Sequence, residues 1–406
     1  MIKFRLAHLG LAMAAIGFTA AAPIVGLSPA YAQKVSAEVG APLQAAQALM
    51  KQGKHKEALA KLREADRAPN KSAHESYLIE RVRAAAASSA GDHDTAAKAF
   101  ETLIASGKLS GAERASFSEG LIGIYMRAGD YSKANAAIQS QLKNGDNAKL
   151  RGYLIQNYYR TGNFSAAETE LKRGGHLSED DLGMLANIQL KKNDKVGYVN
   201  TIEKLAASYP KERYWVDLLN RVQGKPGFAS GRLSVDVYRL KLANNLIKKP
   251  SEYMEMAQLV MQSKAAGEAV KIIEKGYKAG VLGTGPDAAR HQRLKDLAAK
   301  NLAENNKSAI TTEAELIKAK DNDGLVALGY GLVHAGQADK GLKMMESAIK
   351  AGGLRNPDDA KLRLGEAYAA AGKKQQAIST LKSVGGKEGT ADLARYWIMA
   401  INQPMA

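Results

Sequence analysis

One short phrase recurs along this chain and limits its fold more than any other feature. It consists of a glycine, four mostly polar residues and an alanine, and each copy lies between stretches whose apolar residues have helical spacing. From Ala58 to Tyr198 the closing positions are 38, 38, 33 and 31 residues apart. Such periods indicate a stack of repeated units. The clear copies are GKHKEA (Gly53 to Ala58), GDHDTA (Gly91 to Ala96), GDYSKA (Gly129 to Ala134), GNFSAA (Gly162 to Ala167) and GKKQQA (Gly372 to Ala377), and the weaker ones are NDKVGY from Asn193, KAAGEA from Lys264 and GQADKG from Gly336.

We expect each phrase to mark the turn of a helix hairpin. A glycine can take the left-handed conformation that ends a helix, the polar residues start the next helix, and the alanine fits where two helices cross closely. Around Gly129 the apolar residues have helical spacing: Leu121 and Tyr125 precede the turn, and Ala134 and Ile138 follow it. The sequence therefore predicts an all-α chain of helix hairpins.

This pattern resembles the tetratricopeptide repeat (TPR), a helix-turn-helix unit with small, Leu, Gly/Ala and Tyr positions on its first helix and Ala on its second. The resemblance is strongest from Leu362 to Leu381 and good from Leu121 to Ile138 and from Tyr153 to Leu171. It implies a superhelix, or α-solenoid, in which the first helices line a groove that binds segments of other proteins. It also implies that no cofactor is needed.

The repeat pattern weakens in the middle of the chain. We expect one TPR-like array over residues 33–222, an irregular helical connector over 223–252 and a second array over 253–406. The connector lacks the repeat phrase and has Gly/Pro turns, although a helix is expected from Leu233 to Ile247. The last helix, from Thr390 to Gln403, is expected to cap the final hairpin.

The first 32 residues have the pattern of a secretory signal peptide. Lys3 and Arg5 give a basic start, residues 11–27 are apolar, and Ala30-Tyr31-Ala32 is a small-x-small motif. We expect cleavage between Ala32 and Gln33 and export to the periplasm; the alternative is a retained N-terminal membrane helix. Because the chain has no cysteine for a lipid anchor and no later apolar run of about 18 residues, the mature protein is expected to be soluble, without a transmembrane segment.

The chain is basic, with 58 Lys and Arg against 41 Asp and Glu and a net charge of +17. The expected signal peptide has two basic and no acidic side chains, so the mature chain would carry +15. The basic residues are interleaved with acids, and together with export this argues against a nucleic-acid partner. A dispersed basic surface in the periplasm instead fits attraction to anionic glycans, lipid headgroups or acidic proteins.

No pattern supports catalysis, a metal or a cofactor. The absence of cysteine excludes thiol nucleophiles, and the seven histidines form no HExxH motif. Glu75, which precedes Ser76, can be compared with the acid of a glycan-cleaving enzyme, but such an acid needs a raised pKa in an apolar cleft. We expect Glu75 to be an acid in the first turn of an ordinary helix.

The TPR resemblance also indicates which side chains would line a groove. The alternative for each of them is an ordinary solvated helix face. The candidate protein-binding residues are Glu119, Met126 and Arg127 of the third unit, Gln156, Tyr159 and Arg160 of the fourth, and Lys149 near them. Among the 16 tyrosines, Tyr125, Tyr158 and Tyr368 are expected in the core, and Tyr153, Tyr159, Tyr214 and Tyr253 are expected to be freer.

These observations lead to one functional hypothesis and two alternatives. The first is a non-enzymatic periplasmic scaffold that binds another envelope protein through its grooves. The second is a component of an envelope polysaccharide or cell-wall machinery that binds an anionic glycan. The third and most remote is a glycan-cleaving enzyme.

Overall fold

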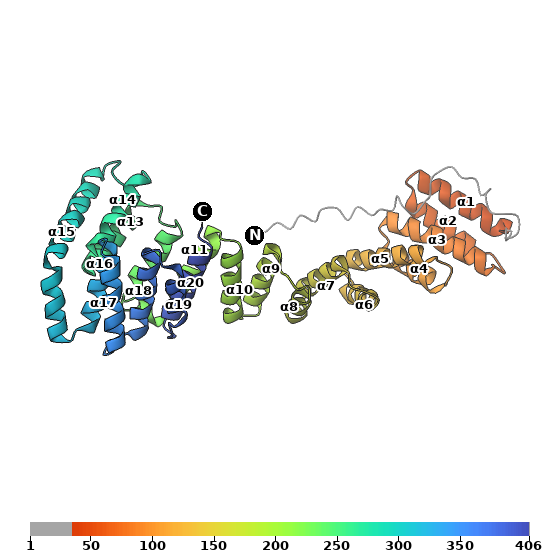
Figure 1. Ribbon diagram of the computed structural model, residues 1–406. Helices are drawn as coiled ribbons and strands as arrows, with labels where there is room; N and C mark the ends of the chain where they lie inside the picture. Colours follow the sequence, from red (N-terminus) through yellow and green to blue (C-terminus); the bar gives the residue numbers. More distant parts are fainter. Residues whose placement is uncertain (1–34, 406) are drawn as a thin grey trace. The chain divides into compact units, whose positions relative to one another are not determined.

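The computed structural model describes residues 35–405, and their regular structure is entirely helical, with twenty α-helices and no strand in this range (Figure 1). The predicted all-α fold is confirmed. The chain forms two compact units, one ending at Thr161 and the other beginning at Gly162. The expected signal peptide, with its cleavage site at Ala32 and Gln33, lies outside the described residues.

The first unit is a run of helix hairpins. Helices α1 and α2, α3 and α4, and α5 and α6 pack as pairs, and each pair also contacts the helix that follows it. The helices are α1 (Ala37–Lys51), α2 (His55–Asp66), α3 (Ala73–Ala90), α4 (His93–Ala105), α5 (Gly111–Ala128), α6 (Tyr131–Leu142) and α7 (Ala148–Arg160).

The second unit contains further hairpins, an irregular middle section and one long helix. Four pairs pack as hairpins: α9 with α10, α13 with α14, α16 with α17, and α18 with α19. The helices are α8 (Phe164–Arg173), α9 (Glu179–Lys191), α10 (Lys195–Ser208), α11 (Glu212–Val222), the 3-10 turn η2 (Pro226–Phe228), α12 (Ser234–Ala243), α13 (Pro250–Gln262), α14 (Ala266–Lys278), α15 (Ala288–Ala319), α16 (Asn322–His334), α17 (Ala338–Ala351), α18 (Pro357–Ala370), α19 (Lys374–Lys382) and α20 (Thr390–Asn402).

The opening residue of every repeat phrase has a left-handed backbone. In the clear copies this residue is glycine, with φ between 72° and 77°. In the weaker copies Gly336 has φ 89°, and Asn193 and Lys264 have φ 57° and 60° although they are not glycines. A left-handed residue at this position ends one helix and turns the chain into the next. The weaker phrases therefore mark the same turn as the clear ones.

The second residue of the phrase begins the next helix in several hairpins. The side chains of Asp92, Asp130, Asn163 and Asp194 each accept a hydrogen bond from a backbone N–H in the first turn of the helix that follows. Such N-caps satisfy a donor that has no partner within the helix. The turn glycine and the capping residue thus fix the end of one helix and the start of the next.

The closing residue of the phrase lies at the helix crossing, as expected. The alanines of all five clear copies have 0% exposure. The weaker copy from Gly336 closes with Gly341, where α17 crosses α16. A Cβ atom at Gly341 would lie 2.3 Å from the carbonyl oxygen of Gly329 on α16, so this crossing has no room even for alanine. The size of the residue that closes the phrase therefore depends on the distance between the two helices at their crossing.

The segment expected to connect two arrays lies inside the second unit. Its helix α12 contacts α13 and also α20, and α20 contacts α10, α18 and α19. Trp215 of α11 has 0% exposure and meets Tyr396 of α20 edge-on, with ring centroids 6.5 Å apart. The last helix therefore packs on the middle section as well as on the final hairpin. The helix expected up to Ile247 ends at Ala243, and Asn245 turns left-handed with φ 53°.

The tyrosines follow the expected pattern only in part. Tyr125 and Tyr368 are buried in the core, whereas Tyr158 is half-buried and its hydroxyl accepts a 2.8 Å hydrogen bond from Gln139. Tyr214 and Tyr253, which were expected to be freer, are 8% and 3% exposed, so that expectation is wrong. Both contribute to apolar clusters of the second unit.

Candidate functional site

The groove residues expected from the sequence all lie in the first unit. Met126 and Tyr159 are half-buried, and Met126 packs against the core. The remaining five candidates, which are exposed, are Glu119, Arg127, Lys149, Gln156 and Arg160.

An ion pair joins two of these residues across helices α5 and α7. Lys149 Nζ on α7 donates to Glu119 Oε2 on α5 at 3.0 Å, and this hydrogen bond raises the pKa of Lys149. The guanidinium of Arg160 donates to the Tyr131 hydroxyl at 3.5 Å. Glu119 and Lys149 are therefore neighbours on α5 and α7. Their role in binding a partner stays a prediction.

Glu75 is the third residue of α3 and forms a capping box with Ser72. One carboxylate oxygen accepts hydrogen bonds from the N–H and hydroxyl of Ser36 at 2.7 and 2.6 Å, and the other accepts from those of Ser72 at 2.8 and 2.9 Å. These bonds lower the pKa of Glu75 to about 2, because they stabilise the charged form. A general acid needs the opposite shift. The arrangement therefore fits a helix cap and does not fit an acid that cleaves glycans.

The second unit contains a cavity of about 300 Å³ between α12 and the first helices of three hairpins, α13, α16 and α18. Three arginines and one tyrosine contribute side chains with hydrogen-bond donors to its wall: Arg232, Arg239, Arg363 and Tyr330. Apolar side chains cover other parts of the wall, namely Val235, Leu259, Val326, Ala327 and Ala360.

Arg239 of α12 is the centre of a buried ionic cluster. Its guanidinium donates to both carboxylate oxygens of Glu268 on α14 at 2.8 Å, to Asp236 at 2.8 Å and to Glu366 on α18 at 3.3 Å. The two-pronged contact with Glu268 matches the fork of donors that arginine presents to a carboxylate. The guanidinium also lies 4.2 Å from the ring centroid of Tyr330 on α16. One side chain thus ties α12 to three other helices.

The cluster contains three guanidinium groups and four carboxyl groups. Its members are Arg232, Arg239, Arg363, Asp236, Asp359, Glu268 and Glu366. Burial raises the pKa of Glu366 well above its usual value, and its Oε1 atom has no hydrogen-bond partner among the described residues. The ion pairs within the cluster offset part of the cost of burying so many ionisable groups together.

The cavity wall keeps hydrogen-bond donors that the protein does not use. Arg363 Nη2 donates to the Arg232 carbonyl at 3.2 Å and to Asp236 at 3.3 Å, but within residues 35–405 nothing accepts from its Nε and Nη1. The Tyr330 hydroxyl likewise forms no hydrogen bond in the described chain, although the residue is only 5% exposed. Its ring lies 4.8 Å from that of His334, whose pKa burial lowers to about 4. His334 is therefore neutral near pH 7.

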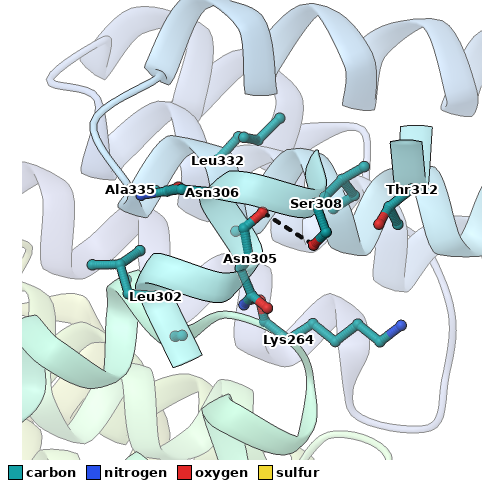
Figure 2. Close-up of a pocket in the computed structure, with 12 residues that line it drawn as sticks. Lys264, Leu302, Asn305, Asn306, Ser308, Thr312, Leu332 and Ala335 are labelled. Carbon is teal, nitrogen blue, oxygen red and sulfur yellow. Dashed lines mark hydrogen bonds between the residues drawn. The ribbon is translucent and has the colours of Figure 1, made fainter. Parts of the chain in front are cut away.

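A smaller cavity of about 160 Å³ lies where α15 passes the turn between α13 and α14 (Figure 2). Two of its polar side chains donate to backbone carbonyls. Asn305 donates to the Lys264 carbonyl at 3.2 Å, and the Ser308 hydroxyl, drawn beside Asn305, donates to the Glu304 carbonyl at 3.1 Å and to the Asn305 carbonyl at 3.5 Å (Figure 2).

The arginine-lined cavity was not expected from the sequence. One signal was present: Asp236 and Arg239 are charged residues three apart within the largely apolar helix expected from Leu233 to Ile247. Charges at that spacing interact on one face of a helix. Their partners Glu268 and Glu366 lie 29 and 127 residues further along the chain, so the pattern could not name them.

One known protein family matches part of this chain. The family described as tetratricopeptide repeat matches residues 82–149 and 326–384. These stretches run from within α3 to the start of α7 and from α16 through α19. The chain therefore contains tetratricopeptide repeats in both compact units. Repeats of this kind generally act as non-catalytic scaffolds that bind other proteins.

Several solved structures match this chain at low sequence identity and low TM-score. One is Naa15/Naa10 bound to HypK-THB, at 16% identity and a TM-score of 0.34, with 87% of this chain and 65% of that one covered. Another is yeast Tom70, at 12% identity and a TM-score of 0.24, with 90% and 95% covered. A third is the TPR domain of P58(IPK), at 11% identity and a TM-score of 0.20, with 90% and 98% covered. Because these TM-scores are low, the fold is assigned from the family match and from the helices themselves. No curated protein matches the sequence significantly.

No helix among residues 35–405 is long and apolar enough to cross a membrane.

Proposed function

We propose that this protein is a non-enzymatic scaffold of the periplasm, which binds another envelope protein along the first helices of its repeats. The expected signal peptide supports export, and the tetratricopeptide repeats at residues 82–149 and 326–384 support protein binding. One observation carries the proposal. The ion pair between Lys149 and Glu119 places exposed polar side chains of α5 and α7 next to each other. Such a surface can contact an extended segment at several points.

The test is a capture experiment with the mature chain, residues 33–406, and an envelope extract, washed at low and at high salt. The binding variant combines Gln156→Ala with Arg160→Ala, which removes exposed side chains of the first helix α7. The matched control combines Lys98→Ala with Ser140→Ala, which removes exposed side chains of the second helices α4 and α6. A protein kept at high salt by the natural chain and the control, but lost with the binding variant, supports a specific scaffold.

Two outcomes contradict the proposal. If all captured material leaves with salt, the net positive charge attracts it and the repeats do not recognise it, because screening weakens exposed charge interactions. The protein would then fit the alternative of an envelope component that binds anionic glycan or lipid headgroups. If the binding variant and the control behave alike at high salt, the contact surface is not on α7.

A further inference from the structure

Helix α15 differs from the repeat helices in its length and in its surface. It has 32 residues, whereas the other α-helices of the described chain have between 9 and 18. It forms one edge of the second unit and packs against α13, α14 and α16 (Figure 1). The buried residues His291, Leu294, Ala298 and Ala309 mark its packed side. Residues on the opposite side are exposed, so this side is available for an interaction.

An apolar stripe runs along the exposed side of α15. Ile310 and Ile317 are 75% and 57% exposed, and the seven residues between them correspond to about two helical turns. Ala299, Ala303 and Ala314 are also exposed and lie on the same side at helical spacing. A continuous exposed apolar surface is typical of an interaction site. None of these five residues lines either cavity described above, so the stripe is a ridge and not a groove.

Positive charge follows one edge of this stripe. Spacings of seven and eleven residues are close to whole numbers of helical turns, so side chains at these spacings lie on one line. Three lysines form such a line beside the stripe, namely Lys300, Lys307 and Lys318. Lys307 and Lys318 form no ion pair within residues 35–405, and Lys300, whose side chain is 72% exposed, has only Glu304 at 3.9 Å. The lysine line is therefore largely free to meet an anion.

The acids of α15 do not cancel this charge. The helix has six basic and four acidic side chains. On the opposite edge of the stripe, Glu313 already pairs with Lys340 of α17 at 2.8 Å. Asp296 precedes the stripe, and Glu315 lies on the far side of the lysine line. The free charge beside the two isoleucines is therefore positive.

This combination of features fits an anionic lipid surface. Apolar side chains on a helix enter the boundary between headgroups and acyl chains, while lysine stems pack on the lipid and their ammonium groups reach the phosphates. A ridge can contact a flat surface along its whole length, whereas a helical peptide is held in a groove, which the stripe does not form. A second copy of α15 packed antiparallel about a two-fold axis would bring the two lysine lines together, and like charges repel.

We infer that α15 attaches the second unit to an anionic phospholipid surface. Ile310 and Ile317 enter the lipid, and Lys300, Lys307 and Lys318 contact the phosphate groups. The inference goes beyond the proposed function, which concerns protein binding along α7 of the first unit. Attachment through α15 would hold the repeats, and any protein bound to them, next to a membrane.

Co-sedimentation of the mature chain with lipid vesicles measures this binding. One set of vesicles contains phosphatidylethanolamine and phosphatidylglycerol in equal parts, and the other contains only phosphatidylcholine. The anionic vesicles should bind at least tenfold more tightly at low salt, because each lysine near an anionic surface strengthens binding about fivefold. Equal binding to both sets of vesicles, or binding to neither, overturns the inference.

Two double variants test the isoleucines. Ile310→Ser with Ile317→Ser should weaken binding to the anionic vesicles at least tenfold, because it removes the large apolar side chains that leave water. Val196→Ser with Leu190→Ser is the matched control, since these side chains are 73% and 49% exposed on the hairpin of α9 and α10. All four residues are exposed, so circular dichroism should show unchanged folding. Equal binding by the two double variants overturns the inference.

Two triple variants distinguish a local contact from a general attraction by net charge. Each replaces three exposed lysines by glutamine and so lowers the net charge by the same amount. The first carries Lys300→Gln, Lys307→Gln and Lys318→Gln, and the control carries Lys143→Gln, Lys191→Gln and Lys204→Gln. The first should weaken binding at least tenfold and the control about twofold at most. Equal losses would mean that net charge alone attracts the chain, and the inference would be wrong.

Insertion into the lipid has its own readout. Ile310→Trp places an indole on the stripe, and brominated phospholipid in the anionic vesicles should quench its fluorescence. Val196→Trp is the control, because it places an indole on an exposed site away from α15 and should not be quenched. Equal quenching of the two variants contradicts insertion through α15.

The outcomes remain separate from those of the capture experiment on α7. Failure of vesicle binding, with specific capture through α7 intact, rejects only the lipid attachment and leaves the proposed scaffold function standing. An acidic protein that is captured by the natural chain and lost with Ile310→Ser and Ile317→Ser, without any vesicle binding, would assign the stripe to a protein partner and overturn the inference.

Discussion

The crossing of α16 and α17 gives a sharp test of how tightly the repeats are packed. Gly341 on α17 faces Gly329 on α16. A Cβ atom added at Gly341 would lie 2.3 Å from the Gly329 carbonyl oxygen and 2.9 Å from the backbone nitrogen of Val333. Both atoms belong to the backbone, so they can move away only if the two helices separate. The substitution Gly341→Ala therefore has two opposing effects on stability: alanine has the higher helix propensity, but its Cβ atom overpacks the crossing.

The two effects have different sizes. Alanine in place of glycine within a helix favours folding by about 1 kcal/mol. Overpacking costs about 1–3 kcal/mol, and a clash with backbone belongs at the upper end. Gly341→Ala should therefore lower the free energy of unfolding by about 2 kcal/mol. Gly183→Ala in α9 is the matched control, because a Cβ atom there meets nothing within 4 Å. It should raise the free energy of unfolding by about 1 kcal/mol.

Thermal and urea unfolding followed by circular dichroism at 222 nm would measure both variants in the full chain. For a unit of this size, about 2 kcal/mol corresponds to a melting temperature lower by about 4–8 °C, and the control should melt about 2–4 °C higher. Hydrogen exchange in α16 and α17 would show whether the loss is local. A Gly341→Ala protein as stable as the control would refute the close crossing and with it the explanation of glycine at this repeat position.

Four further predictions concern the turn, the ionic cluster and the N-terminus. Lys264→Gly should raise the free energy of unfolding by up to about 1 kcal/mol in urea melts, because Lys264 has φ 60° and a left-handed backbone is unfavourable for residues other than glycine. Arg239→Met should lower the free energy of unfolding by about 3–5 kcal/mol, because the substitution leaves buried carboxylates without their cation. An unchanged urea midpoint would show that the cluster is not buried. Burial raises the pKa of Glu366 above its usual 4.5, so between pH 4.5 and the raised pKa the folded chain keeps a proton that the unfolded chain loses. The free energy of unfolding therefore falls as pH rises through this range, by at most about 1.4 kcal/mol per pH unit. Urea melts across the range should show that Glu366→Gln removes this slope. Intact-mass measurement of the exported protein should give a chain that begins at Gln33, and a mass that includes residues 1–32 would show that the segment is retained.

The local parts of the fold could be predicted because they depend on neighbouring residues. The turn glycines and the closing alanines lie five residues apart, and the structure places each of them as the phrase predicts. Even the degenerate phrases at Asn193 and Lys264 mark left-handed turns. Helical spacing and turn chemistry act locally, so a single sequence contains them.

The contacts that organise the second unit could not be predicted for the opposite reason. Tyr396 of the last helix meets Trp215, and Arg239 meets Glu366, across long stretches of chain. No period in the sequence connects such pairs, because they depend on how the irregular middle section folds back onto the hairpins. Tyr214 and Tyr253, which lie outside the repeat pattern, are also buried. The arginine-lined cavity results from this folding back, so the sequence could not place it.

The turn glycines are needed for their left-handed backbone conformation and not for their small size. A Cβ atom built on Gly53, Gly91, Gly129 or Gly372 would meet nothing within 4 Å, yet each residue has φ between 72° and 77°. A residue of the opposite hand takes such angles as readily as an ordinary residue takes a right-handed helix. A chain assembled by chemical ligation with D-alanine at these turns should therefore take the left-handed turn angles without backbone strain, and loss of backbone freedom in its unfolded state should make it more stable. The repeat thus separates its two requirements, handedness at the turn and small volume at the crossing, onto residues five positions apart.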